Sequence, residues 1–218
     1  MIDLHCHILP GIDDGAADWE TAVEMARIAE ADGIHTIVAT PHHRNGIYDN
    51  DIESIEQLTQ DLNRQLQVLG VNVQVLPGAE THYYPEFVVD LQNGKVLPLN
   101  HSKYVYIEFP YQQVPRYIED MVFEIVVSGF TPIVPHPERN RELRDNPDLI
   151  YSLVETGALT QVTAGSIIGN FGSDVEKFSI KLFEHNLGHL VATDAHGTGR
   201  RKPSIREAYV RLGEKFGQ

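Results

Sequence analysis

The sequence has little cysteine, no long apolar run and a shortage of positive charge. A single cysteine, Cys6, among 218 residues excludes an internal disulfide and fits a reducing cytoplasm. No apolar stretch approaches the roughly 20 residues that cross a bilayer, and the N-terminus lacks the pattern of a signal peptide. We therefore expect a cytoplasmic protein without membrane insertion.

Acidic residues outnumber basic ones, with 31 Asp and Glu against 17 Lys and Arg and a net charge of −14. This balance disfavours binding to nucleic-acid phosphates or to anionic membrane surfaces. It still permits a small anionic substrate where local cations override the overall field. With 42% hydrophobic residues, the chain can bury one sizeable core, and we expect residues 1–218 to form a single domain.

Short apolar runs typical of strands alternate with longer amphipathic stretches typical of helices. The predicted strands are 2–8, 35–40, 71–76, 104–109, 131–135, 159–164 and 188–193. The predicted helices are 18–32, 51–69, 115–128, 147–155, 173–185 and 203–216. This alternation predicts an α/β fold of parallel strands joined by helical crossovers. Seven such units suggest a small or distorted barrel, with a doubly wound sheet as the alternative.

The opening segment MIDLHCHILPGIDDG places two histidines and two aspartates around the end of the first predicted strand. Side chains at positions i and i+2 of a strand project to the same face, so we expect Asp3, His5 and His7 on one face. Cys6 falls on the other face, as a small buried apolar residue. The polar face is not ordinary core, and a metal ion is the obvious group to satisfy its imidazoles.

Six of the seven predicted strands deliver His, Asp or Glu at their C-terminal ends, where α/β barrels build their functional sites. The candidates are Asp13 or Asp14, His42 or His43, Glu80, Glu108, His136, and Asp194 with His196. The sequence leaves open which member of each of the first two pairs points inward. The other histidines, His35, His82, His101, His185 and His189, are expected to be ordinary polar residues. The glycine-rich stretch 164–172 is expected to be a tight turn.

Imidazoles and carboxylates without thiolates suit Mn, Fe, Zn or Mg ions, and the sequence does not choose among them. Four carboxylates around three divalent ions would leave a local charge of about +2, which favours a dianionic phosphate monoester. Arg139 and Arg201 are placed to add bidentate contacts to phosphate oxygens.

These residues lie in the motifs HCHILPGIDDG, TPHH, GAE, IEF, HPER, AGS and DAH, in this order along the chain. The series resembles the polymerase-and-histidinol-phosphatase (PHP) superfamily and, more narrowly, the bacterial metal-dependent protein-tyrosine phosphatases of capsule and exopolysaccharide operons. The match runs from Met1 to about Phe216. It implies a distorted seven-stranded (β/α) barrel with three divalent ions, manganese being favoured. The implied metal ligands are His5, His7, Asp14, His42, Glu80, Glu108, His136, Asp194 and His196, and the implied phosphate-contacting residues are Arg139 and Arg201.

Two features depart from the pattern of that family. Pro135 precedes His136 where a small residue is commoner. The chain stops at Gln218, whereas relatives usually continue beyond the position of Phe216. No candidate site residue is lost by this, so we expect an intact site, with stability or oligomerisation as the properties open to change.

The resemblance implies hydrolysis of protein phosphotyrosine, with a tyrosine autokinase of capsular or exopolysaccharide synthesis as the partner. An activated water attacks phosphorus in line while metals and arginines stabilise the equatorial oxygens. Tyrosinate, with a pKa of about 10, leaves more easily than an alkoxide, which relaxes the demand for a general acid. Candidates for that acid are His43 and Glu138. The alternatives are a small-molecule phosphatase such as histidinol-phosphate phosphatase, a non-catalytic metal-binding barrel, and a metal-dependent amidohydrolase.

Overall fold

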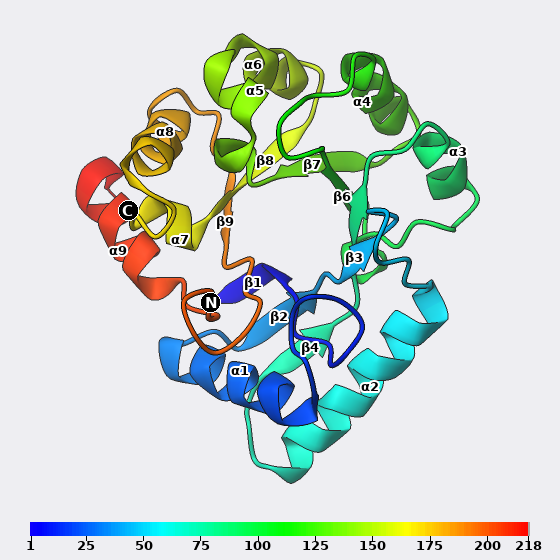
Figure 1. Cartoon of the computed structure of the whole chain (residues 1–218), viewed down its shortest axis with the longest axis vertical. Helices are drawn as coiled ribbons and strands as arrows, with labels where there is room; N and C mark the ends of the chain where they lie inside the picture. The colour runs from blue at the N-terminus through cyan, green and yellow to red at the C-terminus, as the bar shows by residue number, and fades with distance from the viewer. Residues whose placement is uncertain (218) are drawn as a thin grey trace.

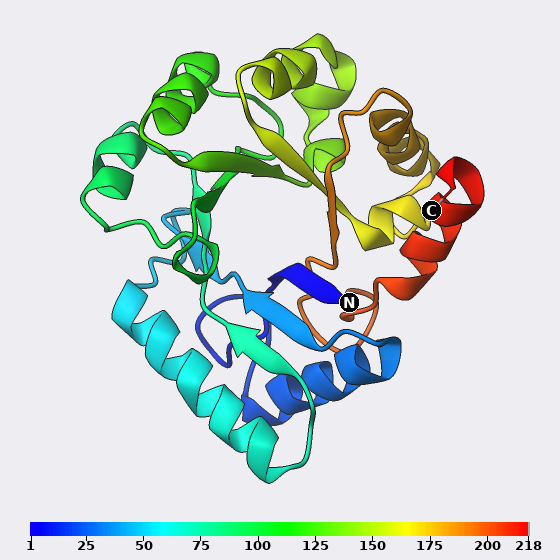
Figure 2. The same cartoon turned by 180° about the vertical axis from the view of Figure 1, so that it is seen from behind.

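The structure is a computed structural model that describes residues 1–217. Helices surround a central group of strands, with α1 and α2 on one side and α4, α6 and α8 on the other (Figure 1). The same arrangement is seen from behind in Figure 2. The strands are β1 (Ile2–Cys6), β2 (Thr36–Ala39), β3 (His42–His43), β4 (Gln74–Leu76), β5 (Glu80–His82), β6 (Tyr104–Glu108), β7 (Thr131–Pro135), β8 (Leu159–Thr163) and β9 (Leu190–Ala192). The α-helices are α1 (Trp19–Asp32), α2 (Ile52–Val68), α3 (Phe87–Gln92), α4 (Ile118–Val127), α5 (Arg141–Asp145), α6 (Asp148–Glu155), α7 (Ala164–Ile167), α8 (Ser173–Glu184) and α9 (Arg206–Phe216), and the 3₁₀ helices are η1 (Leu99–His101) and η2 (Pro137–Arg139).

The strands pair in parallel throughout and form two sheets, in the orders β1-β2-β4 and β3-β5-β6-β7-β8-β9. The predicted parallel α/β architecture is confirmed. Two of the predicted strands continue into second short segments, β3 and β5, after Pro41 and Pro77. Proline has no N–H to donate to a ladder, which accounts for the interruptions. One isolated bridge, Cys6 to Ala195, connects β1 with the segment after β9, and within residues 1–217 the ladders do not join into one closed barrel.

The six predicted helices are present, with ends shifted by a few residues. The α1 helix begins after Asp18, whose carboxylate accepts a hydrogen bond from the backbone N–H of Thr21, and ends at Gly33 with φ of 88°. Helices α3, α5 and α7 contain only 6, 5 and 4 residues, too few to produce an apolar periodicity. The prediction of a tight turn over 164–172 is wrong at its start, because α7 occupies Ala164–Ile167.

A β-bulge in β1 overturns the prediction that Asp3 shares a face with the two histidines. Asp3 pairs with Ile37 and Cys6 with Ala39, so β1 carries one extra residue between these pairs. A bulge changes the side to which the following residues project. The Asp3 side chain is instead bound by the segment after β9, where its carboxylate accepts a hydrogen bond of 2.9 Å from the backbone N–H of Thr193.

The hydrophobic core lies between the strands and the helices and includes Cys6, which is fully buried as predicted. Burial raises the pKa of the Cys6 thiol well above its ordinary value, so this residue is not an activated nucleophile. Within residues 1–217, no helix is both long and apolar enough to span a bilayer.

Candidate metal centre

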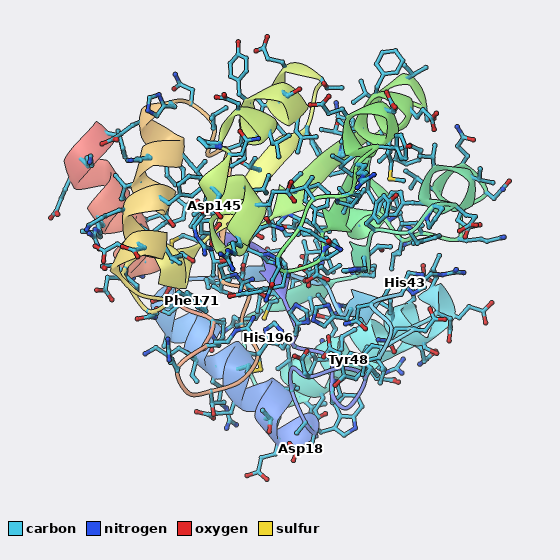
Figure 3. All side chains as sticks on the ribbon, turned by 45° about the horizontal axis from the view of Figure 1, so that its top comes forward. Asp18, His43, Tyr48, Asp145, Phe171 and His196 are labelled. Atoms are coloured by element: carbon cyan, nitrogen blue, oxygen red, sulfur yellow. The ribbon has the colours of Figure 1, made fainter. Side chains whose placement is uncertain are left out.

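The nine predicted metal ligands meet at the C-terminal ends of the strands. Backbone geometry is unusual at two of them, since His136 and Asp194 have φ of 38° and 50°, a left-handed conformation that is strained for residues other than glycine. In the view of Figure 3, the label of His196 lies between those of Phe171 and Tyr48, near the centre of the molecule. Such strain is tolerated where the surrounding structure imposes it, and it commonly marks a functional site.

Seven of the nine side chains fall into three overlapping groups whose potential ligand atoms lie within 4.8 Å of one another. The groups are His7, Asp14, His42 and His196; His5, His7 and Glu80; and His42, Glu80 and Glu108. The other two lie at the edges of these groups. His136 Nε2 is 2.7 Å from Glu80 Oε1, and Asp194 Oδ1 is 3.4 Å from His5 Nε2.

The separations between these atoms match those between ligands of shared ions. Bonds of about 2.0–2.2 Å from a metal to nitrogen or oxygen place neighbouring ligands about 3.0–3.5 Å apart. His5 Nε2 lies 3.2 Å from His7 Nε2, and each of these atoms is 3.4 Å from an oxygen of Glu80. Two ring nitrogens that face each other beside a carboxylate are well suited to a cation between them.

His42 supplies an independent test of this fit. Its Nδ1 atom is buried and has no hydrogen-bond partner in the described part of the chain, although oxygens of Glu80 and Glu108 lie 3.2 and 3.6 Å away. The nitrogen and the oxygens therefore do not satisfy one another, and they point toward common space. A divalent ion there would be bound by all three groups, so the residues fit a metal centre.

Electrostatics keeps the carboxylates of the cluster charged. Burial opposes ionisation of Glu80, but the charge of His5 and hydrogen bonds from His136, His5 and His7 outweigh it and hold its pKa well below the ordinary value. Burial likewise opposes ionisation of Asp194, and Arg139 and His5 outweigh it, so that pKa is also well lowered. The carboxylates of Glu80 and Asp194 are thus both in the ionised form that binds cations.

His196 is held in the neutral form that a metal ligand requires. Burial, together with the neighbouring His7 and Arg201, lowers the pKa of His196 to about 2. Its Nδ1 lies 3.0 Å from the carbonyl oxygen of Asp194, and its Nε2 is 3.5 Å from Asp14 Oδ1. A proton on Nδ1, donated to that carbonyl, leaves the Nε2 lone pair free to face Asp14.

Both predicted phosphate-contacting arginines reach the same carboxylate. Arg139 and Arg201 each donate an Nη2–H to Asp194 Oδ2, the second over 2.8 Å. The Nε atoms of both arginines are buried and have no hydrogen-bond partner among residues 1–217. Asp194 thus holds the two arginine side chains at the edge of the cluster, and other N–H donors of each guanidinium are left for a ligand.

The chain matches the capsular polysaccharide synthesis family CpsB/CapC over residues 1–218. It belongs to this family. The tyrosine-protein phosphatase YwqE of Bacillus subtilis is 47% identical over 217 residues, which cover 100% of this chain and 85% of that protein. These findings confirm the resemblance to bacterial metal-dependent tyrosine phosphatases.

A solved structure agrees with the family assignment, and a second one resembles the fold. A chain from the crystal structures of YwqE from Bacillus subtilis and CpsB from Streptococcus pneumoniae, described as unique metal-dependent tyrosine phosphatases, matches with a TM-score of 0.98 at 47% identity, covering 100% of this chain and 88% of that one. A lactonase from Listeria monocytogenes matches with a TM-score of 0.55 at 12% identity, covering 99% of this chain and 86% of that one. This second likeness extends to the fold alone.

In this CpsB/CapC chain, strand register decides between the adjacent histidines. His42 pairs with Glu80 and His43 with Thr81, so consecutive side chains project to opposite sides of β3. His42 points into the cluster, and His43 lies 3.2 Å from Asp49 instead. The predicted strand over 35–40 ends before both residues, whereas the structure places them in β3.

Neither candidate for the general acid is placed for that role. His43 faces away from the cluster, as its pairing with Asp49 indicates. Glu138 is fully buried, and its Oε1 accepts hydrogen bonds from the backbone N–H of Thr163 over 3.1 Å and from the Ser166 hydroxyl over 2.7 Å. These contacts give neither side chain a hydrogen bond to a residue of the cluster.

Asp13 and Gln161 orient two of the central histidines, a role that sequence reasoning missed. Asp13 Oδ2 is 2.7 Å from His7 Nδ1, and Gln161 Oε1 is 2.7 Å from His5 Nδ1. These contacts fix the ring orientation and leave each Nε2 facing the cluster. The signal for Gln161 was a polar residue inside β8, the one predicted strand without a His, Asp or Glu at its end.

His82 also lies at the cluster, contrary to its prediction as an ordinary polar residue. Its Nδ1 is 3.4 Å from Glu108 Oε2. His101 and His189 have other partners, Glu56 and Thr160 respectively.

Proposed function

We propose that this CpsB/CapC protein is a metal-dependent phosphatase that hydrolyses phosphotyrosine in a protein substrate. The observation that carries the proposal is the position of Asp194, whose Oδ1 faces His5 while its Oδ2 accepts hydrogen bonds from both arginines. A cation-binding cluster and an anion-binding pair thus share one carboxylate. This arrangement suits a phosphate monoester held against metal ions.

Three divalent ions, with manganese as the first candidate, are proposed to occupy the centre. The ligands would be His5, His7, Asp14, His42, Glu80, Glu108, His136, Asp194 and His196. When bound, the ions would lower the pKa of water and neutralise phosphate charge. The three overlapping groups of potential ligands support this number.

Arg139 and Arg201 are proposed to bind the phosphate oxygens that gain charge during the reaction. A guanidinium has five N–H donors in a rigid fork, and Asp194 engages only part of each set. The unpartnered Nε donors are already desolvated, so they lose little hydration when they meet an oxyanion. The phenolate leaving group has a pKa of about 10, so it departs with little need for protonation by a general acid.

Residues 1–218 are proposed to form one PHP-type domain, an open and distorted seven-stranded (β/α) barrel. In this count, β2 with β3 and β4 with β5 each form one interrupted strand. The Cys6–Ala195 bridge supports this, because it brings the edge of one sheet to the end of the other. The proposed partner is a tyrosine autokinase of capsular or exopolysaccharide synthesis. The name of the family and the names of the relatives support this partner.

The decisive experiment combines metal analysis with hydrolysis of a phosphotyrosine peptide. We expect EDTA to abolish hydrolysis and a divalent ion to restore it, while Cys6→Ser retains most of the rate. Histidinol phosphate, tested side by side, should be the poorer substrate. A metal-replete protein that hydrolyses no phosphate ester would contradict the proposal, and faster hydrolysis of histidinol phosphate would favour the small-molecule alternative.

A further inference from the structure

A second cationic cavity lies beside the metal centre. It encloses about 90 Å³ between the turn that follows α7 and the loop that leads to α9. Its polar and aromatic lining includes Asn170, Phe171, Arg200, Arg201, Lys202 and Glu207. Three cations and one carboxylate line it, in a protein whose net charge is −14. The local field therefore opposes that of the whole molecule.

The two outer cations of the cavity are not neutralised by the protein. Among residues 1–217, no carboxylate oxygen lies within 4.0 Å of the charged nitrogens of Arg200 or Lys202. Arg200 donates one hydrogen bond to the backbone carbonyl of Asn170, which leaves most of its donors free. By contrast, Arg44 and Lys95, which lie on two other loops, both approach Asp90.

Two residues connect this cavity with the phosphate-binding arginines. Arg201 lines the cavity and also donates to Asp194. The Phe171 ring centre lies 5.2 Å from the guanidinium carbon of Arg139 and 5.9 Å from that of Arg200. An ideal Cβ on Gly165 would come within 3.1 Å of the Phe171 ring, so a glycine at this position lets the ring sit there. The Phe171 ring thus contacts both Arg139 of the proposed phosphate site and Arg200 of the cavity.

We propose that Arg200 and Lys202 form a subsite for a carboxylate side chain, Asp or Glu, close in sequence to the phosphotyrosine of the substrate. This inference rests on the proposed function and names its substrate class, an acidic phosphotyrosine segment. Consecutive Cα atoms in a peptide are about 3.8 Å apart, so a carboxylate one or two residues from the phosphotyrosine can reach a neighbouring site. The size of the cavity admits one such group.

The test compares two phosphotyrosine peptides that differ only in flanking residues, Glu in one and Gln in the other. For the metal-loaded wild-type protein, we expect kcat/KM to be about 3- to 30-fold higher for the Glu peptide, the range from an exposed ion pair to a charge-assisted hydrogen bond. The difference should lie in KM and should shrink as salt is added. In Arg200→Gln and Lys202→Gln the ratio should fall, and in the double variant it should approach one.

Lys103→Gln is the matched control, because it removes one positive charge at the opposite end of the strands, directly before β6. It should retain the wild-type ratio. Equal hydrolysis of the two peptides by the wild type would overturn the subsite and leave the proposed function standing. An equal fall of the ratio in Lys103→Gln would show that net charge, not a subsite, sets the preference. Hydrolysis of neither peptide would instead reject the proposed function itself.

Discussion

Asp3 accepts hydrogen bonds from the backbone N–H and the hydroxyl of Thr193, a residue 190 positions later in the chain. Asp3 lies in β1 at the edge of the smaller sheet, and Thr193 directly follows β9 at the edge of the larger one. Both side chains are buried, so water does not compete for these bonds. The pair joins the two sheets one residue before Asp194 of the candidate metal centre.

Replacing Thr193 by Val should therefore destabilise the fold. The substitution removes a donor from a buried carboxylate at nearly constant volume, which typically costs about 1–3 kcal/mol in the free energy of unfolding. Urea denaturation in the presence of EDTA measures this without a contribution from bound metal. The control is Thr36→Val, because the one hydrogen bond of its hydroxyl within residues 1–217 is to the exposed His35 ring. Equal effects of the two substitutions would mean that the Asp3–Thr193 contact contributes no special stability.

Glu80 is expected to be indispensable for metal binding. Its two oxygens lie within 3.4 Å of His5, His7, His42 and His136, so Glu80→Gln removes charge at the centre of the cluster. Metal content, measured by mass spectrometry after gel filtration, should fall together with activity. Glu214→Gln, at an exposed position of α9, should retain both. Full metal occupancy in the Glu80 variant would show that this carboxylate is not a ligand.

Asp13 should influence the metal through His7 rather than by direct contact. Asp13→Asn replaces a charged acceptor by a weaker one at the His7 Nδ1 position, and losses of this kind typically reduce metal affinity by about 10- to 100-fold. A fluorescent competitor for divalent ions would report the affinity directly. Unchanged affinity would mean that the orientation of His7 is set by packing alone.

Arg139→Lys and Arg201→Lys should keep the metal content and the fold but lower the rate. Lysine cannot reproduce the two-pronged contact of a guanidinium with phosphate. We expect kcat/KM to fall by about 10- to 1,000-fold, or about 1.4–4 kcal/mol of transition-state stabilisation. A loss confined to KM, with most activity restored by Lys, would indicate electrostatic recruitment only. Near-wild-type kinetics in both variants would assign phosphate binding to the metals.

His189 should make the apoprotein less stable in acid. Burial lowers the pKa of His189, whose Nδ1 accepts a hydrogen bond from the backbone N–H of Thr160. The unfolded chain therefore binds a proton more readily below a pH of about 6.5, so stability contributed by the neutral ring is lost as the pH falls through that value. Urea unfolding with EDTA at pH 7.5 and pH 5.5 should show a smaller difference for His189→Gln than for the wild type. An identical difference would exclude this residue as a source of acid sensitivity.

The sequence by itself determined the α/β class and the chemistry of the site. Alternating apolar runs and amphipathic stretches specify strands and helices through local side-chain periodicity, and capping residues such as Asp18 and Gly33 are read within a few positions. Polar residues at strand ends were informative because parallel strands bring those ends together. Imidazoles and carboxylates without thiolates then indicated a centre for divalent ions.

Tertiary structure alone decided which side chains enter the site and how they are held. A bulge interrupts the register of β1 beside Asp3, which binds Thr193, and the pairing of β3 with β5 selected His42 over His43. Register depends on partner strands far away in sequence, and a shift of one residue reverses the face of every side chain that follows. Gln161 meets His5 across 156 positions for the same reason. Local periodicity shows which side chains of a strand alternate. The pairing of distant strands determines which of the two alternating sets faces the site.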